Sequence, residues 1–138
     1  MPRLIARRFV DTSIWHAAAD CGVASNACAK EILASGEALV TCDHVLIETW
    51  VLLRHRMHRR AAERFWEALR SGVAAIEFVG AADLGDRRLL SRPGFSLVDR
   101  TSFAVMRRLG IERGASFDDD FAIFRFGPNR RRAFTILR

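Results

Sequence analysis

The stretch Phe9-Val10-Asp11-Thr12-Ser13 marks where a predicted strand passes into a predicted helix. Its two apolar residues end the strand, and the residues from Ile14 to Ala19 favour a short helix. Asp11, between the two, is typical of a residue that caps a helix with its side chain. The stretch therefore predicts a strand followed directly by a helix, with a carboxylate at the carboxyl end of the strand.

The rest of the chain repeats this alternation of short apolar runs and longer helical patterns. Strands are predicted over residues 38–42, 75–79, 113–117 and 134–137. Helices are predicted over residues 24–35, 43–57, 59–70, 82–90 and 97–109, with Asp43 as a cap and Gly36 and Gly110 as stops. We expect one α/β domain over residues 1–138, with a mostly parallel sheet of about five strands. In such sheets, ligands bind outside the carboxyl ends of the strands.

The composition is that of a folded protein with a basic surface. The chain has 138 residues, of which 50% are hydrophobic and 28% charged, so it can bury a core and is not expected to be disordered. Its net charge is +6, and Lys30 is the only lysine. Arginine suits phosphate oxygens, so a polyanionic partner is one interpretation of this charge. The other is arginine-rich coding with the excess charge in solvent.

Cysteine usage and the N-terminal segment predict the compartment. Cys21, Cys28 and Cys42 contain no C-x-x-C pair and leave one thiol unpaired in any disulfide scheme, which fits a reducing cytosol. The first residues show no apolar segment that would act as a signal peptide, and no apolar run has the length of a membrane span. We expect a cytoplasmic protein with no membrane partner.

Acidic residues follow or adjoin several predicted strands. They are Asp11, Glu48, Asp99 and the run Asp118-Asp119-Asp120. Most of them have a simple alternative role, because Asp11 can cap a helix and Ser96 with Asp99 has the spacing of a capping box. The three successive aspartates suit the positive end of a helix dipole.

Glu48 and Asp99 are less easily explained by capping. Glu48 shares a predicted helix face with Val45 and Leu52, and His44 is the only local partner. Asp99 likewise has apolar neighbours one and two turns later. A carboxylate in an apolar stripe must be paired, coordinated or protonated. A parallel sheet can bring all of these acids to one edge, where their repulsion calls for a divalent cation. Oxygen ligands favour Mg²⁺ or Mn²⁺, and the histidines and cysteines show no zinc spacing.

Four segments, in this order, resemble the motifs of PIN-domain ribonucleases, and of VapC-type toxins in particular. They are Val10-Asp11-Thr12-Ser13, the helical Glu48, residues 96–106 around Asp99, and Ala115-Ser116-Phe117-Asp118-Asp119-Asp120-Phe121. Ser116 stands where threonine is commoner in the family. The three aspartates leave the last ligand open; the alignment favours Asp118, with Asp120 as a second acid and Asp119 in solvent.

The resemblance implies a three-layer α/β/α PIN-like fold and a Mg²⁺-dependent endoribonuclease, with Mn²⁺ as a substitute. It implies the toxin of a toxin–antitoxin pair, with an RNA substrate, a cognate antitoxin and a homodimer. Glu48 would bind metal or orient water, and Ser13 and Ser116 would hold carboxylates in place. Arg100 or the run from Arg130 to Arg132 would bind phosphates, unless that run is simply solvated. The implied metal ligands are Asp11, Glu48, Asp99, Asp118 and Asp120.

Other classes of protein fit less well. A PIN-like module that only binds a partner should have lost acidic positions, and here all are filled. A phospho-receiver needs a lysine beside its acidic pocket, whereas Lys30 lies in a predicted helix far from the strand ends. The glycine-rich motifs of P-loop and dinucleotide enzymes and the nucleophile elbow of serine hydrolases are absent. The identity of the RNA is not encoded in these patterns.

Overall fold

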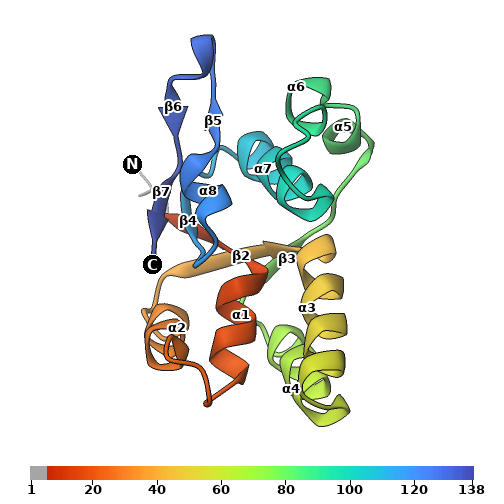
Figure 1. Ribbon diagram of the computed structural model, residues 1–138, viewed down its shortest axis with the longest axis vertical. Coiled ribbons are helices and arrows are strands. Elements are labelled where there is room, and N and C mark those ends of the chain that lie inside the picture. Colours follow the sequence, from red (N-terminus) through yellow and green to blue (C-terminus); the bar gives the residue numbers. More distant parts are fainter. Residues whose placement is uncertain (1–5) are drawn as a thin grey trace.

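In a computed structural model that describes residues 6–138, five strands form a central sheet (Figure 1). All four neighbouring pairs in the sheet are parallel, which confirms the predicted sheet. The first strand of the chain lies in the middle, so the residues that follow it stand at the centre of the carboxyl edge. Across the sheet the strands are β3 (Ala75–Glu77), β2 (Ala38–Cys42), β1 (Arg7–Val10), β4 (Arg113–Ala115) and β7 (Thr135–Leu137).

Helices lie on both sides of the sheet, which confirms the expected three layers (Figure 1). On one side are α1 (Thr12–Ala19), α2 (Asn26–Leu33), α3 (Asp43–Arg56) and α4 (Arg59–Arg70). On the other are α5 (Ala81–Leu84), α6 (Arg87–Leu90), α7 (Leu97–Leu109) and α8 (Asp119–Ile123). Within the described residues, no helix is both long enough and apolar enough to cross a membrane.

A small hairpin near the C-terminus was not predicted. It consists of the antiparallel strands β5 (Arg125–Phe126) and β6 (Arg132–Ala133), joined through the 3-10 turn η1 (Pro128–Arg130). Strands of two residues are too short to show a period of alternating burial, so no sequence pattern marks them. Asn129 and Arg130 both adopt positive φ angles, of 57° and 51°, in the turn of this hairpin.

Some predicted boundaries were wrong for local reasons. The helix predicted over residues 82–90 is divided into α5 and α6, because Gly85 ends the first and the side chain of Asp86 accepts a hydrogen bond from Arg88 N–H to begin the second. The helix that was to end before Gly36 already ends at Leu33. Gly110 does end α7, with a φ of 68°.

Asp43 has a different role from the predicted cap. Cys42 is the N-cap of α3, and Asp43 is the first residue of the helix. The Asp43 carboxylate instead accepts a hydrogen bond from Val79 N–H at 2.9 Å. Asp43 therefore fastens the segment after β3 to the start of α3.

A cluster of phenylalanine rings packs around Phe103 of α7 and holds this helix in place. Phe103 on α7 is fully buried and lies with its ring centroid 4.1 to 5.9 Å from those of four others: Phe95, Phe121, Phe124 and Phe134. Such contacts add to the free energy of burying the rings. Asp99 is one helical turn before Phe103, and Asp120 is next to Phe121, so this cluster holds the segments that carry both acids.

Candidate functional site

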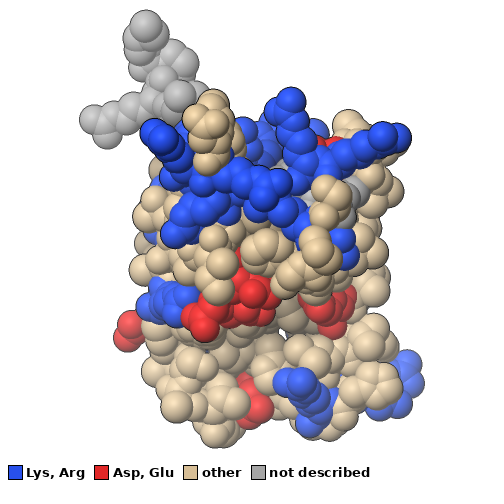
Figure 2. All heavy atoms as spheres, turned by 45° about the horizontal axis from the view of Figure 1, so that its top comes forward, with Lys and Arg blue, Asp and Glu red and all other residues tan. Residues whose placement is uncertain are grey.

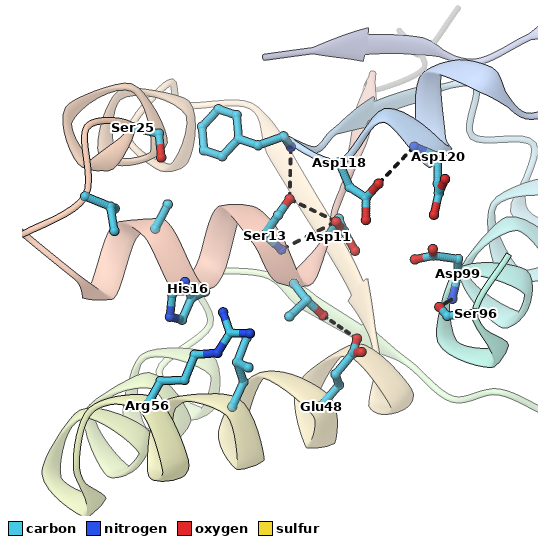
Figure 3. Close-up of a pocket in the computed structure, with 15 residues that line it drawn as sticks. Asp11, Ser13, His16, Ser25, Glu48, Arg56, Ser96, Asp99, Asp118 and Asp120 are labelled. Carbon is cyan, nitrogen blue, oxygen red and sulfur yellow. Dashed lines mark hydrogen bonds between the residues drawn. The ribbon is translucent and has the colours of Figure 1, made fainter.

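A cleft of about 440 Å³ opens at the carboxyl edge of the sheet (Figure 3). Its lining includes all five of the predicted acids: Asp11, Glu48, Asp99, Asp118 and Asp120. They come from the junction of β1 and α1, from α3, from the first turn of α7 and from the start of α8 with its N-cap. The fold thus brings together residues that are far apart in the sequence.

Asp11 is almost completely buried at the base of the cleft. Its backbone N–H donates to the carbonyl of Ala115 at 3.1 Å, which holds it beside the end of β4. Its Oδ2 accepts hydrogen bonds from the hydroxyls of Ser13, at 2.9 Å, and Ser116, at 2.8 Å. Ser13 N–H also donates to this atom, so Asp11 caps α1 as well as lining the cleft. Burial raises the pKa of Asp11, while the two serine hydroxyls act in the opposite direction.

The same two serines tie the segment after β4 to Asp11. Ser13 Oγ accepts a hydrogen bond from Phe117 N–H at 2.9 Å, and Ser116 Oγ accepts one from Asp118 N–H at 3.0 Å. Each hydroxyl therefore donates to the Asp11 carboxylate and receives a backbone N–H. The structure contains the contacts that the predicted supporting role of these serines requires.

Asp99, Asp118 and Asp120 form a compact acidic group. One carboxylate oxygen from each lies within 4.8 Å of the others. Asp99 is 7% exposed, and its N–H donates to Ser96 Oγ at 3.1 Å, which caps α7. Burial, together with the charges of Asp11, Asp118 and Asp120, raises the pKa of Asp99 to about 8. Such a group is stable only when protons or a cation neutralise part of its charge.

The donor set of this group fits a hard divalent cation. Three carboxylates offer only oxygen atoms, which is the chemistry that Mg²⁺ and Mn²⁺ prefer. Two histidines, His44 and His58, have partners outside this group. His44 hydrogen-bonds with Thr101 rather than with Glu48, and the His58 side chain caps α4. Cys42 is buried, and that burial raises its pKa to about 11.

Glu48 lies on a different face of its helix from the one we predicted. It is exposed, whereas the face of α3 that is buried carries Val45, Thr49 and Leu53. The Glu48 side chain reaches towards α1, and its Oε2 accepts a hydrogen bond from Thr12 Oγ1 at 2.8 Å (Figure 3). The prediction that apolar surroundings force Glu48 to find a partner was therefore wrong, although Glu48 does line the cleft.

The run of three aspartates is divided by the start of α8. Asp118 is the N-cap of α8, and its Oδ1 accepts a hydrogen bond from Asp120 N–H at 3.0 Å. Asp119 points away: it is exposed and forms an ion pair with Arg138 at 2.8 Å. Asp118 and Asp120 thus line the cleft, and Asp119 is not among its lining residues.

The far end of the cleft contains two residues that we did not predict, His16 and Arg56 (Figure 3). His16 is one helical turn after Ser13, and Arg56 is two turns after Glu48. Helical spacing from these predicted residues was thus the signal that could have identified both. Within the described residues, His16 Nε2 is buried without a hydrogen-bond partner, and Arg56 forms no ion pair. One end of the cleft is therefore acidic, and the other end carries the positive charge of the Arg56 side chain.

The arginines predicted to bind phosphates do not line this cleft. Arg100 lies in the first turn of α7, where its Nε donates to the carbonyl of Ser96 at 3.4 Å. The run from Arg130 to Arg132 lies in and after the turn of the hairpin, and Arg132 forms an ion pair with Glu112.

Comparison with known proteins identifies relatives over most of the chain. The PIN domain family matches residues 8–127, which include every acidic residue of the cleft. The 23S rRNA-specific endonuclease VapC20 of Mycobacterium tuberculosis is 43% identical over 120 residues, covering 83% of this chain and 91% of that protein.

Solved structures agree with this match. The crystal structure of M. tuberculosis VapC20, a sarcin-ricin loop cleaving toxin, superposes with a TM-score of 0.74 at 41% identity, covering 83% of this chain and 92% of that one. VapBC2 from Rickettsia felis, solved with a DNA fragment from its promoter, has a TM-score of 0.61 at 15% identity, covering 84% and 91%, and shares the fold. The predicted family and fold are confirmed.

The raised pKa of Asp99 predicts how stability changes with pH when no metal is present. The folded protein holds this proton more tightly than the unfolded chain, so stability falls as pH rises from about 4 towards about 8. Asp99→Asn should remove this fall in stability, because the asparagine side chain carries no charge at any of these pH values. In EDTA at pH 8 the variant should unfold roughly 5 °C or more above the wild type, and at pH 4 the two should be alike.

Thermal unfolding followed by circular dichroism measures this difference. Asp119→Asn is the matched control, because Asp119 is exposed and lies outside the acidic group. Adding Mg²⁺ should stabilise the wild type more than Asp99→Asn. An Asp99→Asn variant that is less stable than the wild type at pH 8 in EDTA would contradict the account of the repulsion.

Proposed function

This chain belongs to the PIN-domain family, and we propose that it is a Mg²⁺-dependent endoribonuclease that cleaves RNA in the acidic cleft. The observation that carries this proposal is the group of Asp99, Asp118 and Asp120, whose carboxylate oxygens lie within 4.8 Å of one another beside the buried Asp11. A module that only binds a partner has no use for such a costly arrangement. The cleft is therefore the reaction centre.

The acidic group has the composition of a metal site for phosphodiester hydrolysis. Asp99, Asp118 and Asp120 would hold the cation, and Asp11 would add negative charge from the base of the cleft. When bound, the cation lowers the pKa of a water molecule and stabilises negative charge on phosphate oxygens. Ser13 and Ser116 keep the Asp11 carboxylate in one orientation through their hydrogen bonds.

The remaining side chains of the cleft position the substrate. The hydrogen bond from Thr12 fixes Glu48 at the rim, where its free carboxylate oxygen can accept a hydrogen bond from the attacking water. Arg56 supplies the positive charge for a phosphate next to the scissile one, since a guanidinium can donate two parallel hydrogen bonds to it. His16 lines the same end of the cleft, where its Nε2 is buried without a hydrogen-bond partner in the described residues.

We assign the protein to the cytoplasm as the toxin of a toxin–antitoxin pair. VapC20, which is 43% identical to it, is a toxin that cleaves the sarcin-ricin loop, and we infer a structured RNA as the substrate here as well. An apolar hollow on α3, next to Glu48, is lined by Ile47, Val51, Leu52 and Val98. Ile47 and Val51 are exposed there, so this surface suits the cognate antitoxin. A homodimer is the expected assembly.

Neighbouring aspartates give a matched test of the reaction centre. Asp120→Asn removes a carboxylate of the metal group, so cleavage of RNA in Mg²⁺ or Mn²⁺ should fall by more than the roughly 10- to 100-fold typical of losing a supporting residue. Asp119→Asn should retain near wild-type activity, because Asp119 lies outside the group. The measurement is kcat on a labelled mixed RNA. Wild-type protein that neither cleaves RNA nor binds Mg²⁺ by calorimetry would refute the proposed function.

Two substitutions at Ser116 test whether its hydrogen bond to the Asp11 carboxylate matters for metal binding and catalysis. Ser116→Ala removes the hydroxyl that donates to Asp11, and it should lower metal affinity or kcat by about 10- to 100-fold. Ser116→Thr keeps the hydroxyl and should retain most of the activity. Metal titrations of cleavage by both variants provide the comparison. Equal losses in both variants would show that packing around this fully buried site, rather than the hydrogen bond, is what matters.

A further inference from the structure

A second cleft, of about 750 Å³, lies between α5, α6, the end of α7 and the β5–β6 hairpin. It shares no lining residue with the acidic cleft. Figure 2, which brings this end of the molecule forward, shows a band of basic side chains with acidic side chains gathered beside it. We call this second cleft the arginine cleft, after five of the residues that line it: Arg88, Arg92, Arg107, Arg108 and Arg130.

The arginine cleft has an excess of positive charge, because its lining carries five arginines and two carboxylates, Asp83 and Asp86. Arg108 forms ion pairs with Asp83, at 2.9 Å, and Glu77, at 3.9 Å. The other four arginines form no ion pair with any carboxylate in the described part of the chain. The pKa of Arg92 is lowered, mainly by burial and secondly by the nearby positive charge of Arg130. An anion between these guanidinium groups would relieve their repulsion.

Aromatic rings hold two of these arginines in place. The Arg92 guanidinium lies 5.0 Å from the ring centroid of Phe124, and that of Arg107 lies 4.2 Å from the centroid of Phe126. Both rings are buried, so they are fixed supports. Arg92 also donates to the carbonyl of Arg125 at 3.0 Å. A planar guanidinium that is already positioned loses less conformational freedom when it binds a phosphate.

Helix α7 connects the arginine cleft to the reaction centre. Asp99 is in its first turn, among the acids, and Arg107 is in its last turn, in the arginine cleft. Eight residues of α-helix correspond to about 12 Å. A stacked nucleic-acid strand advances about 3.4 Å per nucleotide, so roughly three or four nucleotides cover this distance.

We propose that the arginine cleft binds the phosphate backbone of the RNA substrate, roughly three or four nucleotides from the scissile bond. This inference rests on the proposed function and extends it. The acidic cleft repels a polyanion, and the arginine cleft supplies the attraction that brings RNA to it. Contacts of this kind fix the register of the strand and do not read its sequence. An acidic protein segment is the competing ligand. We favour RNA because α7 places the arginine cleft within a few nucleotides of the reaction centre at Asp99.

Arg88 and Arg130 are the residues to change, because both are exposed and neither is stacked on a ring. R88Q/R130Q removes two positive charges from the arginine cleft. The matched control is R60Q/R64Q, which removes two exposed arginines from α4, at the other end of the molecule (Figure 1). Thermal unfolding of both variants checks that they are folded.

Binding of a labelled single-stranded RNA is measured by fluorescence anisotropy in EDTA, over a range of salt concentrations. R88Q/R130Q should raise Kd by about three- to tenfold and reduce the slope of log K against log salt by about 1.4, or about 0.7 per phosphate contact. R60Q/R64Q should have little effect on either quantity. In Mg²⁺, R88Q/R130Q should raise KM for the labelled mixed RNA of the cleavage assay and retain kcat.

The outcomes separate the two proposals. Cleavage by the wild type, with equal RNA affinities and salt slopes for R88Q/R130Q and R60Q/R64Q, would overturn the role of the arginine cleft alone. No cleavage by the wild type under any metal condition would overturn the proposed function, whatever the affinities. An oligoglutamate peptide that loses its binding in R88Q/R130Q, while RNA affinity stays unchanged, would assign the cleft to an acidic protein instead.

Discussion

Repulsion among carboxylates at the carboxyl edge of the sheet is the constraint on which the rest of the structure depends. Asp99 is buried, and the charges of its neighbours add to the effect of burial on its pKa. The fold opposes this repulsion from several directions. The rings around Phe103 hold α7, the hydroxyls of Ser13 and Ser116 hold Asp11, and the first turn of α8 holds Asp118. A divalent cation would turn the same arrangement from a cost into a stabilising interaction.

The candidate site was largely predictable because helix capping and metal binding use the same positions. In an alternating fold each helix starts where a strand ends, and its free N–H groups favour a carboxylate there. Asp11 and Asp118 are both N-caps, and Ser96 caps the helix that carries Asp99. The two interpretations of these residues are therefore compatible. His16 and Arg56 lie at helical spacing from Ser13 and Glu48, but their meeting in one cleft depends on how α1 and α3 lie against each other, which helical spacing alone does not specify.

The predictable part of the fold is the part with long periodic segments. The helices α3, α4 and α7 follow from apolar patterns of ordinary length, whereas the strands β3, β4 and β7 have three residues each and were predicted one or two residues too long. The exposure of Glu48 was not predictable, since Val45 and Leu52 share its helix face and the turn of α3 towards the cleft is a tertiary effect. The β5–β6 hairpin was missed because its strands have two residues each and depend on the rings of Phe124 and Phe126 for their position.

The central claim is that the acidic group is built for a divalent cation, and the location of a bound Mn²⁺ ion tests it most directly. Crystals grown with Mn²⁺ and measured at the manganese absorption edge reveal the ion by its anomalous scattering. The account predicts a peak within coordination distance of Asp99, Asp118 and Asp120, which disappears in Asp99→Asn. No peak at this group at a Mn²⁺ concentration that supports cleavage, or a peak at other residues alone, would contradict it.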